Sequence, residues 1–171
     1  KIHFIGVSNW TTQRIEEANK FAEKNGMEPI RISQINYSLA HSSVETFGDN
    51  TLVCMDTKEF RWYKKHDFPV MAFSPQAKGF FAKLAKGDAA NNLPEGQYAG
   101  PANLARLAKV KQLSEQTGDT PAKITLGYLN SQPFFVSSVF AVTKLWQLDE
   151  DMEAQDLTYD PKTVAFLENM I

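Results

Sequence analysis

The chain has 171 residues, 43% of them hydrophobic, which indicates one domain with enough apolar side chains for a core. Its 18 basic and 20 acidic side chains give a formal net charge of −2, which argues against nucleic acid and anionic membranes as partners. We expect a cytoplasmic protein, because no apolar stretch approaches the roughly 20 residues that span a bilayer, the sequence shows no signal-peptide pattern, and the single cysteine, Cys54, cannot form an internal disulfide.

The first predicted strand covers residues 4–7, a short run that contains Phe, Ile and Val. The helix after it has the clearest pattern in the chain, with apolar residues spaced three and four apart. Thr11 or Thr12 can cap its amino end, and Gly26 ends it. A second strand is predicted at 30–35, where β-branched residues are concentrated.

The rest of the chain repeats this order of strand and helix around one long loop rich in Gly, Asn and Pro. Further elements are predicted as helices at about 56–65, 102–116, 120–130, 146–154 and 160–167, strands at 68–73 and 135–142, and the loop at 87–101. Strands that alternate with helices indicate βαβ units and a parallel sheet. Apolar runs without polar alternation indicate strands that are covered on both faces.

Polar residues follow each predicted strand, at the end where a (β/α)₈ barrel places its chemistry. Amides and hydroxyls there suit a ligand with its own amide, an aromatic ring can stack on a flat ring, and lysine with glycine suits a phosphate. Each residue alone also has an ordinary interpretation: Ser8 and Asn9 as a turn cap, Phe73 as core, and Lys78 and Lys144 as solvated surface. Gln34 lies in an apolar strand and needs hydrogen-bond partners if it is buried there, and a structural network could supply them as readily as a ligand.

Read together, several segments are similar to motifs of the aldo-keto reductase family. The matching segments are residues 5–10 (IGVSNW), 34–39 (QINYSL), 72–75 (AFSP) with Gly79, 120–129 (TPAKITLGYL), 143–144 (TK), 147–150 (QLDE), 156–158 (DLT) and 164–169 (VAFLEN). Their order and approximate spacing follow the family from one end of the chain to the other.

This resemblance implies an α/β fold in which residues 1–171 form the carboxy-terminal half of a (β/α)₈ TIM barrel. The four parallel βα units would be strands five to eight of that barrel with their helices. The resemblance also implies NADPH as the cofactor. The residues that would hold its nicotinamide are Ser8, Asn9, Gln34 and Phe73, and those that would hold its pyrophosphate and adenosine are Ser74, Gln76, Lys78, Lys144, Gln147 and Asp151.

Three positions depart from the family's pattern. Gln76-Ala77 replaces the usual Leu-Gly or Leu-Ala pair, and Ala141-Val142 stands where a Pro-Gly type turn is usual. Asp151 occupies the position of the Asn that usually faces adenine, and a carboxylate near phosphates is unfavourable. The acidic run 149–151 by itself is typical of a solvated helix start. These departures concern the phosphate-binding part of the expected cofactor site and above all its adenosine end.

No catalytic residue is assigned to this chain. The resemblance implies that the proton-donating tyrosine and its lysine, aspartate and histidine neighbours come from the amino-terminal half of the barrel. Tyr37 belongs to the family's ordinary sixth-strand motif, and residues 64–66 fit the surface end of a helix. His3 and His41 lack a partner arrangement for nucleophilic catalysis, and no metal-ligand spacing occurs.

The implied function is the NADPH-binding half of an oxidoreductase that reduces a small carbonyl substrate. The alternative is a non-catalytic truncated remnant or interaction module that keeps the half-barrel fold. Four strands of a barrel leave two unpaired edges and an exposed inner face. We therefore expect a partner, which is either a second copy in a homodimer or an amino-terminal half-barrel.

Overall fold

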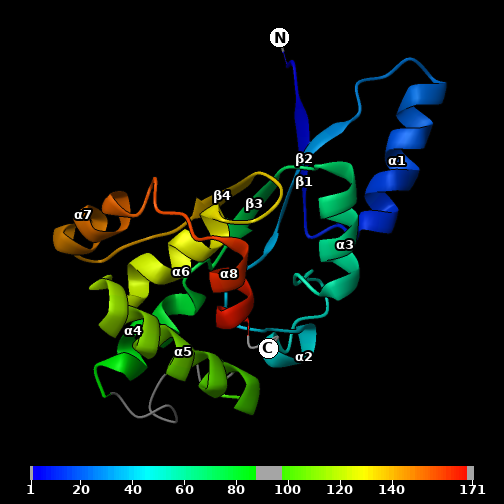
Figure 1. The fold of residues 1–171 in the computed structure, drawn as a ribbon. Helices are drawn as coiled ribbons and strands as arrows, with labels where there is room; N and C mark the ends of the chain where they lie inside the picture. The colour runs from blue at the N-terminus through cyan, green and yellow to red at the C-terminus, as the bar shows by residue number, and fades with distance from the viewer. Residues whose placement is uncertain (1, 88–97, 169–171) are drawn as a thin grey trace.

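The computed structural model describes residues 2–87 and 98–168. In this part of the chain, one parallel sheet is formed by the strands β1 (Ile5–Ser8), β2 (Ile30–Asn36), β3 (Val70–Phe73) and β4 (Val136–Val139). The strand order is β1-β2-β3-β4, so strands that are consecutive along the chain are neighbours in the sheet (Figure 1). The predicted parallel βα organisation is therefore confirmed.

The described helices are α1 (Thr12–Lys24), α2 (Val44–Phe47), α3 (Thr57–His66), α4 (Phe80–Ala85), α5 (Pro101–Thr117), α6 (Pro121–Asn130), α7 (Leu145–Glu153) and α8 (Pro161–Leu167), with a 3₁₀ turn η1 (Ala77–Gly79). Thr11 and Thr120 accept hydrogen bonds from the backbone N–H of the third residue of α1 and α6, Arg14 and Lys123, which confirms both predicted caps. Helices α1 and α3 lie together beside β1 and β2, and α4 to α7 lie on the β3 and β4 side (Figure 1). Within the described ranges, no helix combines the length and apolar character needed to cross a bilayer.

Two helices, α2 and α4, were not among the predicted elements. Helix α2 is a single turn, capped by Ser43 and ended by Gly48 at φ 64°, so it is too short to show a helical period. Helix α4 follows the 3₁₀ turn η1, and its apolar residues are adjacent rather than spaced along one face. Strand β4 is also shorter than the predicted 135–142. Residues 88–97 of the predicted loop at 87–101 lie outside the described residues.

The described helices cover one face of the sheet. Ile35, Val70 and Ala72 on that face are fully buried. On the other face, Gln34 and Phe73 retain part of their exposure, as the register and the alternation of strand side chains require. The prediction that the strands are covered on both faces was therefore wrong for this part of the chain, because the covering side chains on the second face are not supplied by the described residues.

Both edges of the sheet are unpaired within the described residues, because β1 pairs with β2 alone and β4 with β3 alone. Large apolar side chains stand exposed beside each edge. Phe4 next to β1 is 72% exposed, and Phe135 next to β4 is 63% exposed. Unpaired edges of this kind can accept further strands through their free backbone groups.

Helix α6 crosses the core so closely that Gly127 has no room for a side chain. A Cβ at this position would lie 2.9 Å from both Leu157 Cγ and Tyr159 Cε2. Gly127→Ala is therefore expected to lower the free energy of unfolding by about 2 kcal/mol, although alanine is the better helix former. Urea denaturation would measure this. In the control Gly100→Ala, whose Cβ meets nothing within 4 Å, a loss under about 1 kcal/mol is expected; equal losses would contradict the packing argument.

A buried carboxylate joins α1 to α3. Glu59 on α3 is 4% exposed and Thr12 on α1 is 2% exposed. One Glu59 oxygen accepts the Thr12 backbone N–H at 2.9 Å, and the other accepts the Thr12 hydroxyl at 3.3 Å. Because the first N–H groups of a helix have no partner within that helix, Glu59 satisfies a donor of α1 that would otherwise be buried and unpaired.

Candidate functional site

Three of the predicted site residues, Ser8, Asn9 and Gln34, lie together where β1 and β2 end. Ser8 and Gln34 are register partners, and the Ser8 hydroxyl donates to Gln34 Oε1 at 3.4 Å. The backbone N–H of Asn9 donates to the Gln34 carbonyl oxygen at 2.9 Å, which extends the pairing of the strands by one residue. The carboxamides of Asn9 and Gln34 and the hydroxyl of Ser8 supply donors and acceptors without net charge.

The Asn9 side chain also has a structural role that the sequence did not indicate. Its Oδ1 accepts the backbone N–H of Val53 at 3.1 Å. The Val53 carbonyl oxygen in turn accepts the Asn36 backbone N–H at 3.0 Å, and Cys54 forms a parallel bridge with Asn36. The segment around Val53 therefore takes the place beside β2 that β1 leaves when it ends. With Oδ1 engaged, the amide nitrogen of Asn9 is the group that can serve a ligand.

Left-handed backbone conformations are concentrated at the ends of β1 and β3. Non-glycine residues with positive φ in the described chain are Asn9, Asp67, Ser74, Ala77 and Lys78. Asp67 ends helix α3, whereas the other four belong to the two loops that carry predicted site residues. Such conformations cost about 1–3 kcal/mol each and are found preferentially at ligand-binding sites. The turn after β3 is therefore held in shape at the expense of local strain.

Replacing Lys78, which has φ 55°, by glycine is expected to raise the free energy of unfolding by about 0.5–1 kcal/mol, because glycine adopts this region without steric cost. The relevant measurement is the urea midpoint. Lys64→Gly provides the control, because Lys64 lies inside the regular helix α3, where glycine is expected to lower stability by about 1 kcal/mol. A loss of stability in Lys78→Gly would show that the backbone at this turn is unstrained.

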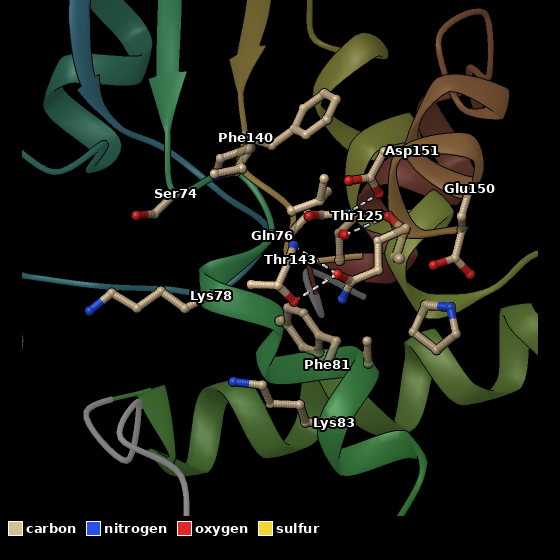
Figure 2. A pocket seen from close by; sticks show the side chains of 18 of the residues that line it. Ser74, Gln76, Lys78, Phe81, Lys83, Thr125, Phe140, Thr143, Glu150 and Asp151 are labelled. Atoms are coloured by element: carbon tan, nitrogen blue, oxygen red, sulfur yellow. Dashed lines mark hydrogen bonds between the residues drawn. The ribbon is translucent and has the colours of Figure 1, made fainter. Parts of the chain in front are cut away.

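A pocket of about 710 Å³ continues from the end of β3 toward α7 (Figure 2). The turn at Ser74, Gln76 and Lys78 forms one wall of the pocket. Helix α4 and the start of α6 form the second wall, and the segment after β4 forms the third together with α7. In Figure 2, Lys78 and Lys83 lie on the side away from Glu150 and Asp151. Lys78 and Lys83 are thus separated from the two carboxylates, while Lys86, which also lines the pocket, has its ammonium group 5.2 Å from the centre of the Trp146 ring.

A hydrogen bond joins the two walls: Gln76 Nε2 donates to Asp151 Oδ1 at 2.6 Å (Figure 2). Asp151 is 5% exposed. Burial raises the pKa of Asp151, and the hydrogen bond from Gln76 acts in the opposite direction. The interpretation of residues 149–151 as a solvated helix start was wrong for Asp151, because this residue lies in the carboxy-terminal part of α7 and faces the pocket.

The structure brings half of the predicted site residues into this pocket: Ser74, Gln76, Lys78, Gln147 and Asp151 line it. Ser8, Asn9 and Gln34 form the separate cluster at β1 and β2. Phe73 lies on the same open face of the sheet as Gln34, which follows from the register of β2 and β3. Lys144 is exposed at the start of α7 and does not line the pocket.

The donor set is compatible with a nicotinamide dinucleotide. Such a ligand has a carboxamide at one end, two phosphates in the middle and an adenosine at the other end. The Ser8, Asn9 and Gln34 cluster offers partners to a carboxamide, and the strained turn at Ser74 and Lys78 offers backbone N–H groups and a cation to phosphates.

Tyr37, Tyr63 and Tyr159 have phenol groups whose pKa burial raises. Tyr37 is 4% exposed, and its ring lies against Tyr128 and Phe134. Burial raises the pKa of Tyr37 well above its usual value. Burial also raises the pKa of Tyr63 and of Tyr159 to about 12.

Several residues that line the pocket were missed in the sequence, namely Phe81, Lys83, Lys86, Thr125 and Trp146. Phe81, Lys83 and Thr125 lie on α4 and α6, and Lys86 directly follows α4, all at positions far from any strand end. The sequence placed Trp146 in a helix but gave it no role. Its spacing of four residues from Glu150 could have indicated that the two side chains share one helix face and line the same pocket.

Comparisons with known proteins agree with the motifs. A model of the aldo/keto reductase family matches residues 1–171. Protein tas of Escherichia coli (strain K12) is 23% identical over 170 residues, which cover 98% of this chain and 47% of that protein, and Protein tas of Shigella flexneri gives the same values. The crystal structure of the thermostable aldo-keto reductase Tm1743 has a TM-score of 0.63 at 17% identity and is covered to 48%, against 98% of this chain. The chain thus spans about half the length of these relatives.

Proposed function

Because the chain belongs to the aldo/keto reductase family, we propose that it provides the NADPH-binding half of a carbonyl reductase. The observation that carries the proposal is the continuity of the site. The Ser8, Asn9 and Gln34 cluster lies at the ends of β1 and β2, and the turn after β3 leads from the same end of the sheet into the pocket. A ligand with a carboxamide at one end and phosphates in the middle fits this order of groups.

In this proposal Gln34 and Ser8 hold the carboxamide, and the side-chain nitrogen of Asn9 donates to its oxygen. Phe73 lies on the same sheet face as Gln34 and supplies an apolar surface for the pyridine ring. The remaining groups hold the pyrophosphate and adenosine, and are Ser74, Gln76, Lys78, Lys144, Gln147 and Asp151. Lys144 stands outside the pocket lining, where a 2′-phosphate that projects to solvent could reach it.

NADPH, when bound, supplies the hydride that reduces a carbonyl carbon. The carbonyl oxygen must then receive a proton from an acidic group close to it. Burial disfavours this role for Tyr37, as its raised pKa indicates. We therefore assign the proton donor to an amino-terminal half-barrel, and this chain's own contribution is to bind and orient the dinucleotide.

The exposed surfaces support such a partner. The sheet has an open face and two unpaired edges, and the outer face of α7 carries Leu145, Leu148 and Met152, which are 82%, 38% and 49% exposed. Helix α1, which lies beside β1 and β2, carries Phe21, which is 63% exposed. An eight-strand barrel would pair both sheet edges and cover the open face of the sheet.

Titration of the chain with NADPH, followed by nicotinamide fluorescence, tests the binding half of the proposal. Saturable binding without reduction of a small aldehyde or ketone is the expected result. Turnover by this chain alone would overturn the assignment of the proton donor to another half. Absence of NADPH binding would instead favour a non-catalytic remnant or interaction module that keeps the half-barrel fold.

Sedimentation of the chain tests the partner. In the presence of an amino-terminal half from an aldo-keto reductase relative, a heterodimer with carbonyl-reducing activity is expected. A homodimer that resists the added half would identify a second copy as the partner. A monodisperse monomer that ignores the added half would contradict the proposed completion of the barrel.

A further inference from the structure

Asn36, the last residue of β2, is fully buried although it is polar. Its backbone already joins the neighbouring segment: the N–H donates to the Val53 carbonyl oxygen at 3.0 Å, and the carbonyl oxygen accepts the Met55 N–H at 2.8 Å. The side chain is therefore not needed for this pairing. Burial of a carboxamide is unfavourable unless it forms hydrogen bonds, whereas leucine, with the same branched shape, carries no such cost. An asparagine here indicates a task that an apolar side chain could not perform.

The Asn36 side chain connects two other parts of the chain. Its Nδ2 donates to the carbonyl oxygen of Phe73, the last residue of β3, at 3.3 Å. Its Oδ1 accepts the hydroxyl of Ser42 at 2.6 Å, and Ser42 is itself 7% exposed. Because the Ser42 hydroxyl binds the oxygen of the carboxamide, the nitrogen is the end that is directed at Phe73. Ser42 therefore orients Asn36.

The Phe73 carbonyl lies at the point where the sheet ends and the turn of the pocket begins. Besides Asn36, it accepts the Tyr37 backbone N–H at 3.4 Å, which is long for a hydrogen bond of this type. The Phe73 carbonyl and the Ser74 N–H belong to one planar peptide group, so a carbonyl that is held in place also sets the direction of that N–H. Ser74 has φ 52° and lines the pocket (Figure 2). The Asn36 bond thus acts on the first residue of the strained turn.

We propose that Asn36, oriented by Ser42, is a positioning residue for the nucleotide site. It holds the Phe73–Ser74 peptide group, and thereby keeps the turn from Ser74 to Lys78 in the conformation that presents its N–H groups to phosphates. The inference rests on the proposed function, because this turn is the proposed phosphate-binding part of the site. Asn36 acts through the turn, since it is fully buried and does not line the pocket.

Asn36→Leu removes the donor to Phe73 and leaves the strand pairing in place. It is expected to weaken NADPH binding about ten-fold, because a displaced turn loses hydrogen bonds to charged phosphates. ADP-ribose, which carries the adenosine and pyrophosphate without the nicotinamide, should weaken by the same factor. Calorimetry measures both affinities. Ser42→Ala keeps Asn36 but removes its orienting partner, and should weaken both ligands about three-fold. This second variant carries the test if Asn36→Leu fails to fold.

Asn19→Leu is the matched control, because it removes the same kind of anchor at the other end of β2. Asn19 Nδ2 donates to the Ile30 carbonyl oxygen at 3.1 Å, and its Oδ1 accepts the Ile30 N–H at 2.7 Å. Ile30 begins β2, at the end away from the turn. Asn19→Leu is expected to lower the stability of the fold and to leave both affinities unchanged. A purely structural role for Asn36 predicts instead that folded Asn36→Leu binds both ligands as Asn19→Leu does.

Amide hydrogen exchange reports on the turn itself without any ligand. The Ala77 N–H donates to the Ser74 carbonyl oxygen at 2.9 Å, and Ala77 is fully buried. In Asn36→Leu this amide is expected to exchange at least about ten-fold faster than in Asn19→Leu, because the turn opens locally more often. Equal exchange rates in the two variants would overturn the inference.

The two readouts separate this inference from the proposed function. If Asn36→Leu and Ser42→Ala bind NADPH as tightly as the wild type, the positioning role is wrong and the proposed function stands. If the wild type does not bind NADPH, the proposed function is wrong, and the exchange rate of the Ala77 amide alone decides whether Asn36 sets the turn. Weaker binding of both ligands together with faster exchange at Ala77 supports both.

Discussion

Gln34→Leu is expected to weaken NADPH binding by about 30-fold while it leaves the affinity for ADP-ribose unchanged. Leucine fills nearly the same space as glutamine, so the substitution removes hydrogen bonds without opening a hole. Gln34 is the residue to which Ser8 and Asn9 are both connected, through Oε1 at 3.4 Å and through the backbone oxygen at 2.9 Å. In the variant, the carboxamide of bound NADPH would lie against the sheet without a hydrogen-bond partner. An unpaired buried polar group costs more binding free energy than the net contribution of a single hydrogen bond.

Isothermal titration of both ligands measures this difference. Gln116→Leu is a matched control, because Gln116 is exposed on α5 and does not line the pocket. Equal weakening of NADPH and ADP-ribose would mean that Gln34 supports the whole site instead of the nicotinamide end. Unchanged NADPH binding would remove Gln34 from the site altogether.

The second large effect concerns stability. Glu59→Ala is expected to lower the free energy of unfolding by about 3 kcal/mol, because the backbone N–H of Thr12 would remain buried without its 2.9 Å partner. Urea denaturation at pH 7 measures this loss. Glu17→Ala, an exposed substitution on α1, is the control, with an expected change within about 0.5 kcal/mol. A loss in Glu59→Ala no larger than that of the control would show that Thr12 finds another partner.

The same carboxylate gives a pH dependence with a defined sign. Burial raises the pKa of Glu59, and the hydrogen bond from Thr12 opposes the change. The folded chain then retains the Glu59 proton to a higher pH than the unfolded chain, so the stability that this group contributes at low pH is lost as the pH rises through the raised pKa. Glu59→Gln removes this titration. The free energy of unfolding of Glu59→Gln should therefore increase relative to that of the wild type as the pH rises from about 4. An increase relative to the wild type as the pH falls would contradict the raised pKa of Glu59.

The elements with a clear period or cap were predictable from sequence. Helix α6 begins at Pro121 after the Thr120 cap, as Thr-Pro predicts, and α1 ends next to Gly26. Strand order followed from the alternation of strands and helices, because consecutive parallel strands joined by helices are usually neighbours. The two short helices α2 and α4 had no period to detect, since each has fewer than two turns.

The polar cluster at the strand ends was predictable for the same reason. Ser8 and Gln34 follow from where strands end, and the register makes them partners. The contact of Gln76 with Asp151 joins residues 75 positions apart, and no local pattern encodes such a pairing. Nor did a local signal show that Asn9 holds Val53 with its side-chain oxygen, because the same Asn could equally have capped a turn.

The two strand edges that stay unpaired among the described residues also have a consequence for handling the chain. Since all four strands run in one direction, β4 of one molecule can join β1 of the next, and that molecule still presents a free β4 of its own. Addition of this kind ends when the chain of molecules closes on itself and otherwise grows into a fibre. Light scattering that increases with protein concentration, and that is suppressed by a lysine in place of Val139 on the β4 edge, would reveal this growth.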